Sequence, residues 1–594
     1  MEGNMVSNYD NQYLLDNTCL STECQMLFFQ KMKELLHIHS GISYSFKIHN
    51  SYTILEELLN VIIDYESNKI NGMTVEEVRK EAKQIISSDV VIRFKYPELY
   101  EVIKEAVAVA LKTTNTQAID SNSIAKMHSI KETIKQLFHK FKPVDYLQTS
   151  LILTKNAIDN SEGRDVVALC QVIVSASLMI NRTISGLYSS ISNFFEDKEL
   201  SFDENWRRWS AILLIAESKY ICYIPIDEKF KDSLENKKTG IELKELYVEA
   251  DRKEYLEEGS IYNEVEVDAP ASDLPSIYNK AYTSYRNELA IIEFATAKVE
   301  KLEKTIYAYD VHNKGFIKIE PKENEFVYKP YNQYHVNIEQ AIKKFILLLK
   351  EQNQRDYAKV IGAITNVCNF EREGNEYGFL LLWSSLEALF RSNQFDTAIG
   401  AIKNIIPTII TRRYIYYKLV DFIKDAQKAG VTYSYESREF IKKNPSDQDI
   451  ETLYRLLQCQ EQYDSLADLC KQKYVLLYYK CYELKNMVIN AGAISNVITH
   501  HKETLEYHLQ RMYRVRNKFM HHAEIDKNIS ALYKHLLVYT WECIREMAYV
   551  SETRNIRSLE EIYAYFRMNH GISIKSMKDA RNSVDFDRIK NGYL

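Results

Sequence analysis

The sequence contains few of the residues that make tight turns. It has 16 glycines and 9 prolines among 594 residues, about 4% of the chain against roughly 12% in an average protein. Glycine supplies the left-handed conformations of turns, bulges and phosphate-binding loops, so a chain this poor in glycine must be built mainly of helices. We therefore predict a mainly α protein with more than one domain, because single hydrophobic cores stop growing at about 250–300 residues.

Long apolar runs and closely paired cysteines are also missing. The longest apolar stretch, Val166–Ile180, is interrupted by Gln and Ser and is shorter than the roughly 20 residues that a membrane span needs. Residues 1–12 carry acids and no basic segment ahead of an apolar run, so we expect no secretory signal, no membrane partner and a cytoplasmic protein. The nine cysteines include no Cys-x-x-Cys pair, which predicts reduced thiols.

The motifs of several enzyme classes are absent too. The chain has no Walker loop, no Gly-x-Gly-x-x-Gly and no Gly-x-Ser-x-Gly, so nucleotide hydrolysis and serine-hydrolase chemistry lack support. Five of the 14 histidines fall within residues 500–522 without a Cys pair or a His-Glu-x-x-His motif, so we predict neither a metal site nor a cofactor. The net charge of −6 gives no general attraction for nucleic acid, and phosphate binding would require a local basic patch.

Three regions follow one another along the chain. Residues 1–205 show apolar side chains three or four positions apart, as in successive helices. Residues 206–330 hold five of the nine prolines and an acidic run, which predicts a linker or mixed insert, with one small β-hairpin around His312–Gly315. The helical pattern returns in residues 331–594. We interpret the N-terminal region as a sensor or regulatory domain and the C-terminal region as the effector.

The local basic patch lies in residues 511–522, which contain four Arg or Lys residues and no acid. Basic side chains next to an aromatic ring are typical of sites that bind unpaired RNA. A solvated basic helix face has the same composition, so composition alone leaves both interpretations open. The candidate RNA-binding residues are Arg511, Tyr513, Arg514, Lys518 and His522.

Within the patch, Arg516-Asn517-x-x-x-His521 places a permanent cation five residues before an imidazole. Histidine can donate and accept protons near neutral pH, and arginine binds phosphate oxygens. These are two needs of metal-free RNA cleavage, in which the 2′-hydroxyl attacks the adjacent phosphorus. On a regular helix the two side chains stand about 140° apart, so one helix directs them poorly at one phosphate. We therefore expect a homodimer in which a second copy faces the first.

This segment resembles a known family. Arg516-Asn517-Lys518-Phe519-Met520-His521 is similar to the Arg-Asn-x-x-x-His motif of the HEPN superfamily, many of whose active members are metal-independent endoribonucleases. Upstream, Phe379–Phe390 is similar to the first core helix of the ApeA-like HEPN branch, which belongs to bacterial anti-phage defence. The resemblance covers residues from about 340 to 560 and implies a helical HEPN-type nuclease domain. The residues that it implies as catalytic are Arg516, Asn517, His521 and, as an acid that orients the arginine, Glu387.

Alternatives remain open at two levels. Within the motif, His522 and Arg514 also fit the looser spacing of the family, and Glu387 could simply be a solvated position on an apolar helix. For the domain as a whole, we expect an endoribonuclease that cuts single-stranded RNA or tRNA loops in anti-phage defence or a toxin-like abortive response, controlled by a phage-derived trigger or regulatory partner. The alternative is a catalytically silent HEPN-fold scaffold or RNA-binding protein.

Overall fold

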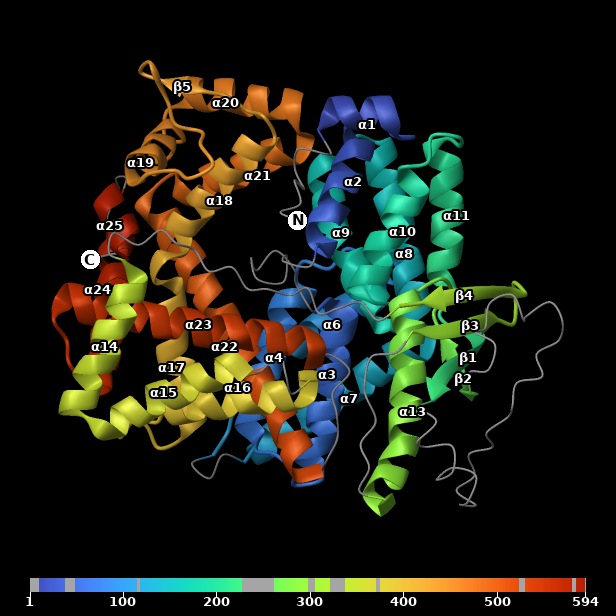
Figure 1. Cartoon of the computed structure of the whole chain (residues 1–594), viewed down its shortest axis with the longest axis horizontal. Coiled ribbons are helices and arrows are strands. Elements are labelled where there is room, and N and C mark those ends of the chain that lie inside the picture. The colour runs from blue at the N-terminus through green and yellow to red at the C-terminus, as the bar shows by residue number, and fades with distance from the viewer. Residues whose placement is uncertain are drawn as a thin grey trace. The chain divides into compact units, whose positions relative to one another are not determined.

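The computed structural model describes residues 10–37, 49–114, 118–226, 261–296, 305–320, 337–369, 374–522, 529–579 and 584–592. The chain divides into two compact units: unit 1 comprises residues 1–13, 41–43 and 327–594, and unit 2 comprises residues 14–40 and 44–326. Helices dominate both (Figure 1), so the mainly α fold is confirmed. No described helix is both long enough and apolar enough to cross a membrane.

Unit 2 contains most of the helices that the N-terminal pattern predicts. Helix α1 (Asn11–Asn17) passes from unit 1 into unit 2 along the chain. The next helices are α2 (Glu23–Leu36), α3 (Ser51–Glu66), α4 (Gly72–Ile86), α5 (Val91–Lys95), α6 (Pro97–Ala108), α7 (Ser121–Lys140), α8 (Pro143–Asp159), α9 (Gly163–Met179), α10 (Ile184–Phe195) and α11 (Phe202–Leu214). The two prolines of this region, Pro97 and Pro143, each open a helix, where the missing N–H is not needed.

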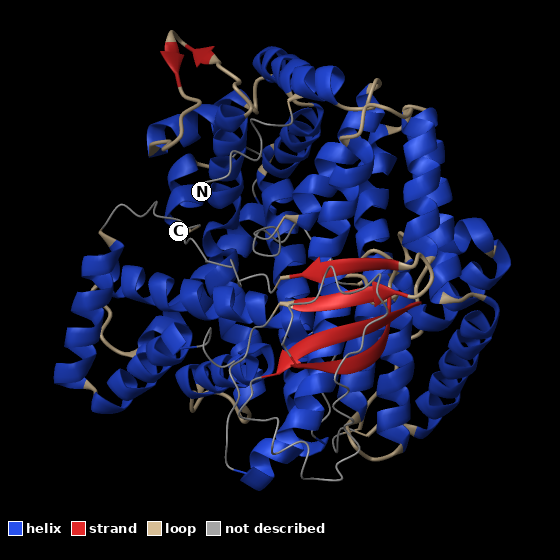
Figure 2. Ribbon diagram, turned by 45° about the vertical axis from the view of Figure 1, so that its right-hand side comes forward, coloured by secondary structure: helices blue, strands red, loops and turns tan. Residues whose placement is uncertain are grey.

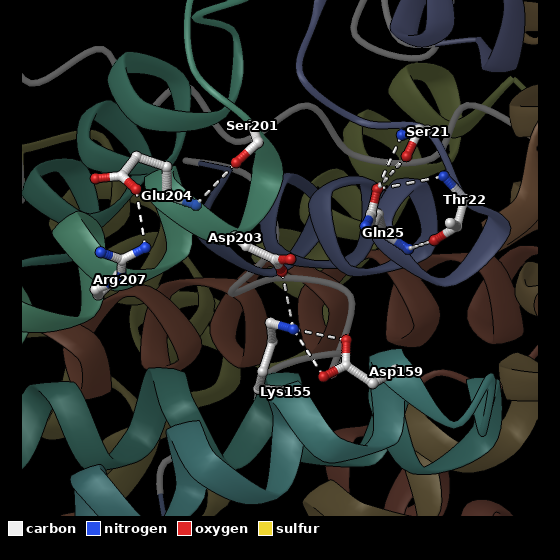
Figure 3. Close-up of polar contacts among 9 residues, drawn as sticks. All are labelled: Ser21, Thr22, Gln25, Lys155, Asp159, Ser201, Asp203, Glu204 and Arg207. Atoms are coloured by element: carbon white, nitrogen blue, oxygen red, sulfur yellow. Dashed lines mark hydrogen bonds and ion pairs between the residues drawn. The ribbon is translucent and has the colours of Figure 1, made fainter.

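Polar contacts fix the ends of these helices (Figure 3). At the start of α2, the Thr22 side chain accepts a hydrogen bond from the Gln25 backbone at 3.3 Å, and the Gln25 side chain accepts one from the Thr22 backbone at 3.2 Å. This reciprocal cap satisfies two donors that a helix otherwise leaves unpaired. The Lys155 ammonium of α8 lies 2.6 Å from Asp159 and 2.9 Å from Asp203, so it joins α8 to the first turn of α11.

A small antiparallel sheet completes unit 2 (Figure 2). Its strands are β1 (Ser218–Ile226), β2 (Ile261–Ala269), β3 (Ile306–Asp310) and β4 (Gly315–Ile319), in the order β2-β1-β3-β4. In the centre Cys222 lies opposite Val265 on one side and Ala308 on the other. Helix α13 (Leu274–Thr296) covers one face of the sheet with Ile277 and Ala281. The expected hairpin around His312–Gly315 corresponds to β3 and β4, within a larger mixed layer.

Where the structure describes unit 1, its regular elements are helices and one short hairpin. Its elements are α14 (Ile338–Gln352), α15 (Gln354–Asn369), α16 (Gly374–Phe390), α17 (Ala398–Ile410), the 3-10 turn η4 (Thr411–Arg413), α18 (Tyr414–Lys428), β5 (Ser434–Tyr435), β6 (Arg438–Glu439), α19 (Asp447–Leu456), α20 (Gln460–Lys473), α21 (Val475–Val488), α22 (Ala491–His522), α23 (Ile529–Arg554), α24 (Leu559–Asp579) and α25 (Phe586–Asn591). Helix α16 packs on α15 and α23, while α22 packs on α17, α21 and α24. The two segments that resemble HEPN, Phe379–Phe390 and Arg516–His521, therefore lie in α16 and at the end of α22.

Candidate functional site

The basic segment forms the C-terminal part of α22. One stripe of this helix is buried and consists of Ile494, Ile498, Leu505, Leu509, Met512 and Val515. Their spacing of three, four or seven positions repeats with the helical period, which explains why the segment folds as one continuous amphipathic helix. Because α22 runs without a break to His522, Arg516 and His521 share one helix and stand about 140° apart around its axis.

Helix α16 supplies the acidic partner of the site. Its core stripe is fully buried and consists of Phe379, Leu382, Trp383, Leu386, Leu389 and Phe390. Glu387 follows Leu386 at the edge of this stripe, and its side chain is 25% exposed. An isolated charged side chain in this position would turn to water, but Glu387 instead reaches a cation on α22.

The Arg516 guanidinium is held from two sides. Its Nη2 lies 3.3 Å from the Glu387 Oε2 atom, and its Nη1 donates a hydrogen bond of 3.0 Å to the Asn517 Oδ1 atom. Glu387 and Arg516 are separated by 129 residues in sequence. A guanidinium carries five N–H donors, so these two contacts orient the group and leave other donors for an anion. A partly exposed pair of this kind contributes at most about 1 kcal/mol to stability, so its main effect is to position Arg516.

Two aromatic contacts accompany the ion pair between α16 and α22. The Trp383 and Tyr513 ring centroids are 6.0 Å apart, and those of Tyr377 and Phe519 are 6.3 Å apart. Trp383 is fully buried, so Tyr513 contributes to packing, whereas Tyr377 is largely exposed. The sequence predicted a stacking role for Tyr513 and missed Tyr377. The only sequence signal for Tyr377 is its place two residues before the α16 segment that resembles HEPN.

The other predicted site residues differ in exposure. Arg511 is buried, while Arg514 and Lys518 are partly exposed. The backbones of His521 and His522 complete the last turn of α22, and their side chains lie outside the described residues. The predicted roles of these two histidines therefore stay predictions.

Two of the histidines further upstream on α22, His501 and His508, are buried in the interior of unit 1. His501 stacks on Tyr414 with 4.0 Å between ring centroids, and burial lowers its pKa to about 3. His508 Nδ1 lies 2.7 Å from the Tyr539 hydroxyl oxygen, and its ring packs edge-on against His535 at 4.7 Å. Burial lowers the pKa of His535 to about 4, so His501 and His535 are neutral at pH 7. In the described part of the chain, no three metal-binding side chains come together.

No family model, curated protein or solved structure matches the chain. The function therefore has to follow from the chemistry of the residues that meet between α16 and α22. A guanidinium held by a carboxylate and an amide can bind a phosphate and neutralise charge that develops on it. The same helix carries two histidines in its last turn, and histidine is the side chain best suited to proton transfer near neutral pH.

Proposed function

We propose that this chain is a metal-independent endoribonuclease of the HEPN type, which cuts single-stranded RNA or RNA loops, including those of tRNA. The observation that carries the proposal is the contact of Arg516 with Glu387 at 3.3 Å. It joins the two distant segments that the HEPN resemblance pairs, and the resemblance assigns an orienting role to Glu387.

In the proposed reaction, the ribose 2′-hydroxyl attacks the adjacent phosphorus. An imidazole, assigned to His521, accepts the proton of this hydroxyl, and a second proton donor protonates the departing 5′-oxygen. Arg516 neutralises the negative charge that grows on the phosphorane oxygens. Glu387 and Asn517 hold the guanidinium in place. The products are a 2′,3′-cyclic phosphate and a 5′-hydroxyl, and no metal takes part.

The proposed active unit is a homodimer. Arg516 and His521 diverge by about 140° on one helix, and the reaction needs both a base and an acid. In a two-fold interface the same surface faces itself, so the last turns of two α22 helices would line one groove with both side chains from each copy. Mixing Arg516→Ala chains with His521→Ala chains should then recover part of the activity. Full activity of a strictly monomeric protein at nanomolar concentration would contradict the dimer.

We place this activity in the cytoplasm, in anti-phage defence or a toxin-like abortive response. Uncontrolled RNA cleavage would harm the cell that makes the enzyme. We therefore propose that unit 2 restrains the nuclease in unit 1 and senses a phage-derived trigger or regulatory partner. Such a division would explain why a nuclease of this kind has more than 300 residues outside its catalytic unit.

Cleavage of purified RNA in EDTA tests the function. The full-length protein should cut total RNA, and Arg516→Ala should slow the reaction about 10²- to 10³-fold, as is typical when a stabiliser of transition-state charge is removed. Arg455→Ala is a matched control, because it removes an exposed arginine of the same unit that pairs with Glu451. RNA binding without cleavage by any of these proteins would favour the silent scaffold.

A further inference from the structure

Two aromatic pairs also join α16 and α22, and their α22 members, Tyr513 and Phe519, lie three residues before and after Arg516. Trp383 is fully buried and lies against Tyr513, so this pair is a side-chain contact between α16 and α22 in the interior. The Tyr377 and Phe519 rings meet at 89° with centroids 6.3 Å apart, an edge-to-face arrangement. Tyr377 is 64% exposed. The second pair therefore presents the Tyr377 ring to solvent, in contact with a residue that follows Arg516 by three positions on α22.

The α22 segment that contacts Tyr377 through Phe519 carries both an exposed apolar side chain and basic residues. Phe519 follows Arg516 by three residues, about 4.5 Å along the helix axis. Met520, the next residue, is 55% exposed. The charged residues of the segment 511–518 are all basic. Single-stranded RNA has the complementary chemistry, because its bases offer flat faces to aromatic rings and its phosphates pair with cations.

We propose that Tyr377 is a platform on which one unpaired RNA base stacks while a neighbouring phosphate contacts Arg516. This inference rests on the proposed function and specifies how its substrate is recognised. A base inside a duplex is already stacked on both faces, so the platform selects unpaired nucleotides. Every base has a π face, so the platform tolerates different sequences and distinguishes single strands from helices.

Binding of an RNA analogue that cannot be cut tests the platform separately from catalysis. The probe is a fluorescein-labelled 2′-O-methyl oligonucleotide, which lacks the attacking hydroxyl, and fluorescence anisotropy measures its Kd for the full-length protein. Tyr377→Ala should weaken binding about 5- to 150-fold, the range found for losing one base stack, and Tyr377→Phe should keep the affinity within about 2-fold. Met568→Ala is the matched control, since Met568 lies on α24 and is 65% exposed.

The salt dependence of Kd separates stacking from charge. Arg516→Ala should reduce the slope of log Kd against log salt by about 0.7, the value for one phosphate contact on a single strand, while Tyr377→Ala should leave the slope unchanged. An abasic nucleotide at the stacked position should weaken binding to the wild type and have no further effect on Tyr377→Ala. The platform would be overturned if Tyr377→Ala bound the oligonucleotide with unchanged affinity. It would also be overturned if Tyr377→Ala lost its dimers and still bound the oligonucleotide. If the expected binding results were obtained but ordinary RNA were not cut, the platform would be supported and the nuclease rejected.

Discussion

At the residue scale, the mechanism gives Glu387 one task, which is to orient Arg516. Glu387→Gln keeps an oxygen at the same place and removes the charge that attracts the guanidinium. We expect kcat to fall about 10- to 100-fold, because small displacements of a catalytic group are costly, while the thermal unfolding temperature changes little. Glu552→Gln is the control, since it breaks the comparable surface pair with Lys344 in the same unit. Wild-type kcat in Glu387→Gln would remove Glu387 from the mechanism.

The residues of the site differ in how far the sequence reveals them. Arg516 and Asn517 stand next to each other in a motif with fixed spacing, and the resemblance points to Glu387 on a distant helix; the structure brings all three together. Tyr377 could not be found in this way, because it is one of 43 tyrosines and nothing in its local pattern sets it apart. Its position depends on how α16 meets α22, which is a property of tertiary packing.

At the element scale, the sequence reveals helices better than strands. Strand β4 begins at Gly315 after the turn, so the β3–β4 hairpin follows from alternation and turn chemistry. Strand β2 falls within the acidic run that suggested a linker. Its acids Glu264 and Glu266 point outward while Val265 and Val267 are buried against the sheet core. The alternation was present, but the high charge of the outer face obscured it.

Close packing between α10 and α13 leads to a prediction for unit 2. Asp273 is buried and accepts hydrogen bonds from the Thr183 backbone at 2.7 Å and from its hydroxyl at 2.6 Å. A Cβ atom on Gly186 would lie 2.4 Å from this carboxyl group. Gly186→Ala should therefore destabilise unit 2 by about 1–3 kcal/mol.

Thermal unfolding measures this effect, and hydrogen exchange of α10 and α13 locates it. The control is Gly362→Ala on α15, where no atom outside the adjoining backbone of the helix lies within 4 Å of the new Cβ; it should be neutral or stabilising by up to about 1 kcal/mol. Equal stability of the two variants would show that Asp273 does not constrain Gly186.

At the scale of the whole molecule, the chain divides in a way that the sequence shows only in part. The change of composition near residue 330 lies close to the start of the main segment of unit 1 at Val327. No pattern in the sequence predicts that residues 1–13 belong to unit 1, whose main segment lies at the other end of the chain. Asn11 joins this segment to the rest of unit 1. Its side chain donates a hydrogen bond of 2.9 Å to the Lys471 carbonyl and accepts one of 3.1 Å from the backbone N–H of Val475, the first residue of α21.

Separation of the units tests the proposed restraint. A fragment of residues 327–594 should be more toxic in cells than the full chain, because unit 2 is absent, and Arg516→Ala in the fragment should cancel the toxicity. The fragment lacks Asn11, so the comparison requires equal soluble levels of the two proteins. Equal harmlessness of fragment and full chain at equal soluble levels would count against restraint by unit 2.

The chemistry of the cleaved ends tests the central claim most directly. The wild-type protein and His522→Ala, incubated with RNA in EDTA, should both leave 5′-hydroxyl ends and 2′,3′-cyclic phosphates or their 3′-phosphate products. His521→Ala should be slower by about 10²- to 10⁴-fold, the usual contribution of a general acid or base. A substrate with a 2′-deoxy nucleotide at the cut should stay intact. Products with 3′-hydroxyl ends, or a reaction that stops in EDTA, would contradict metal-free attack by the 2′-hydroxyl.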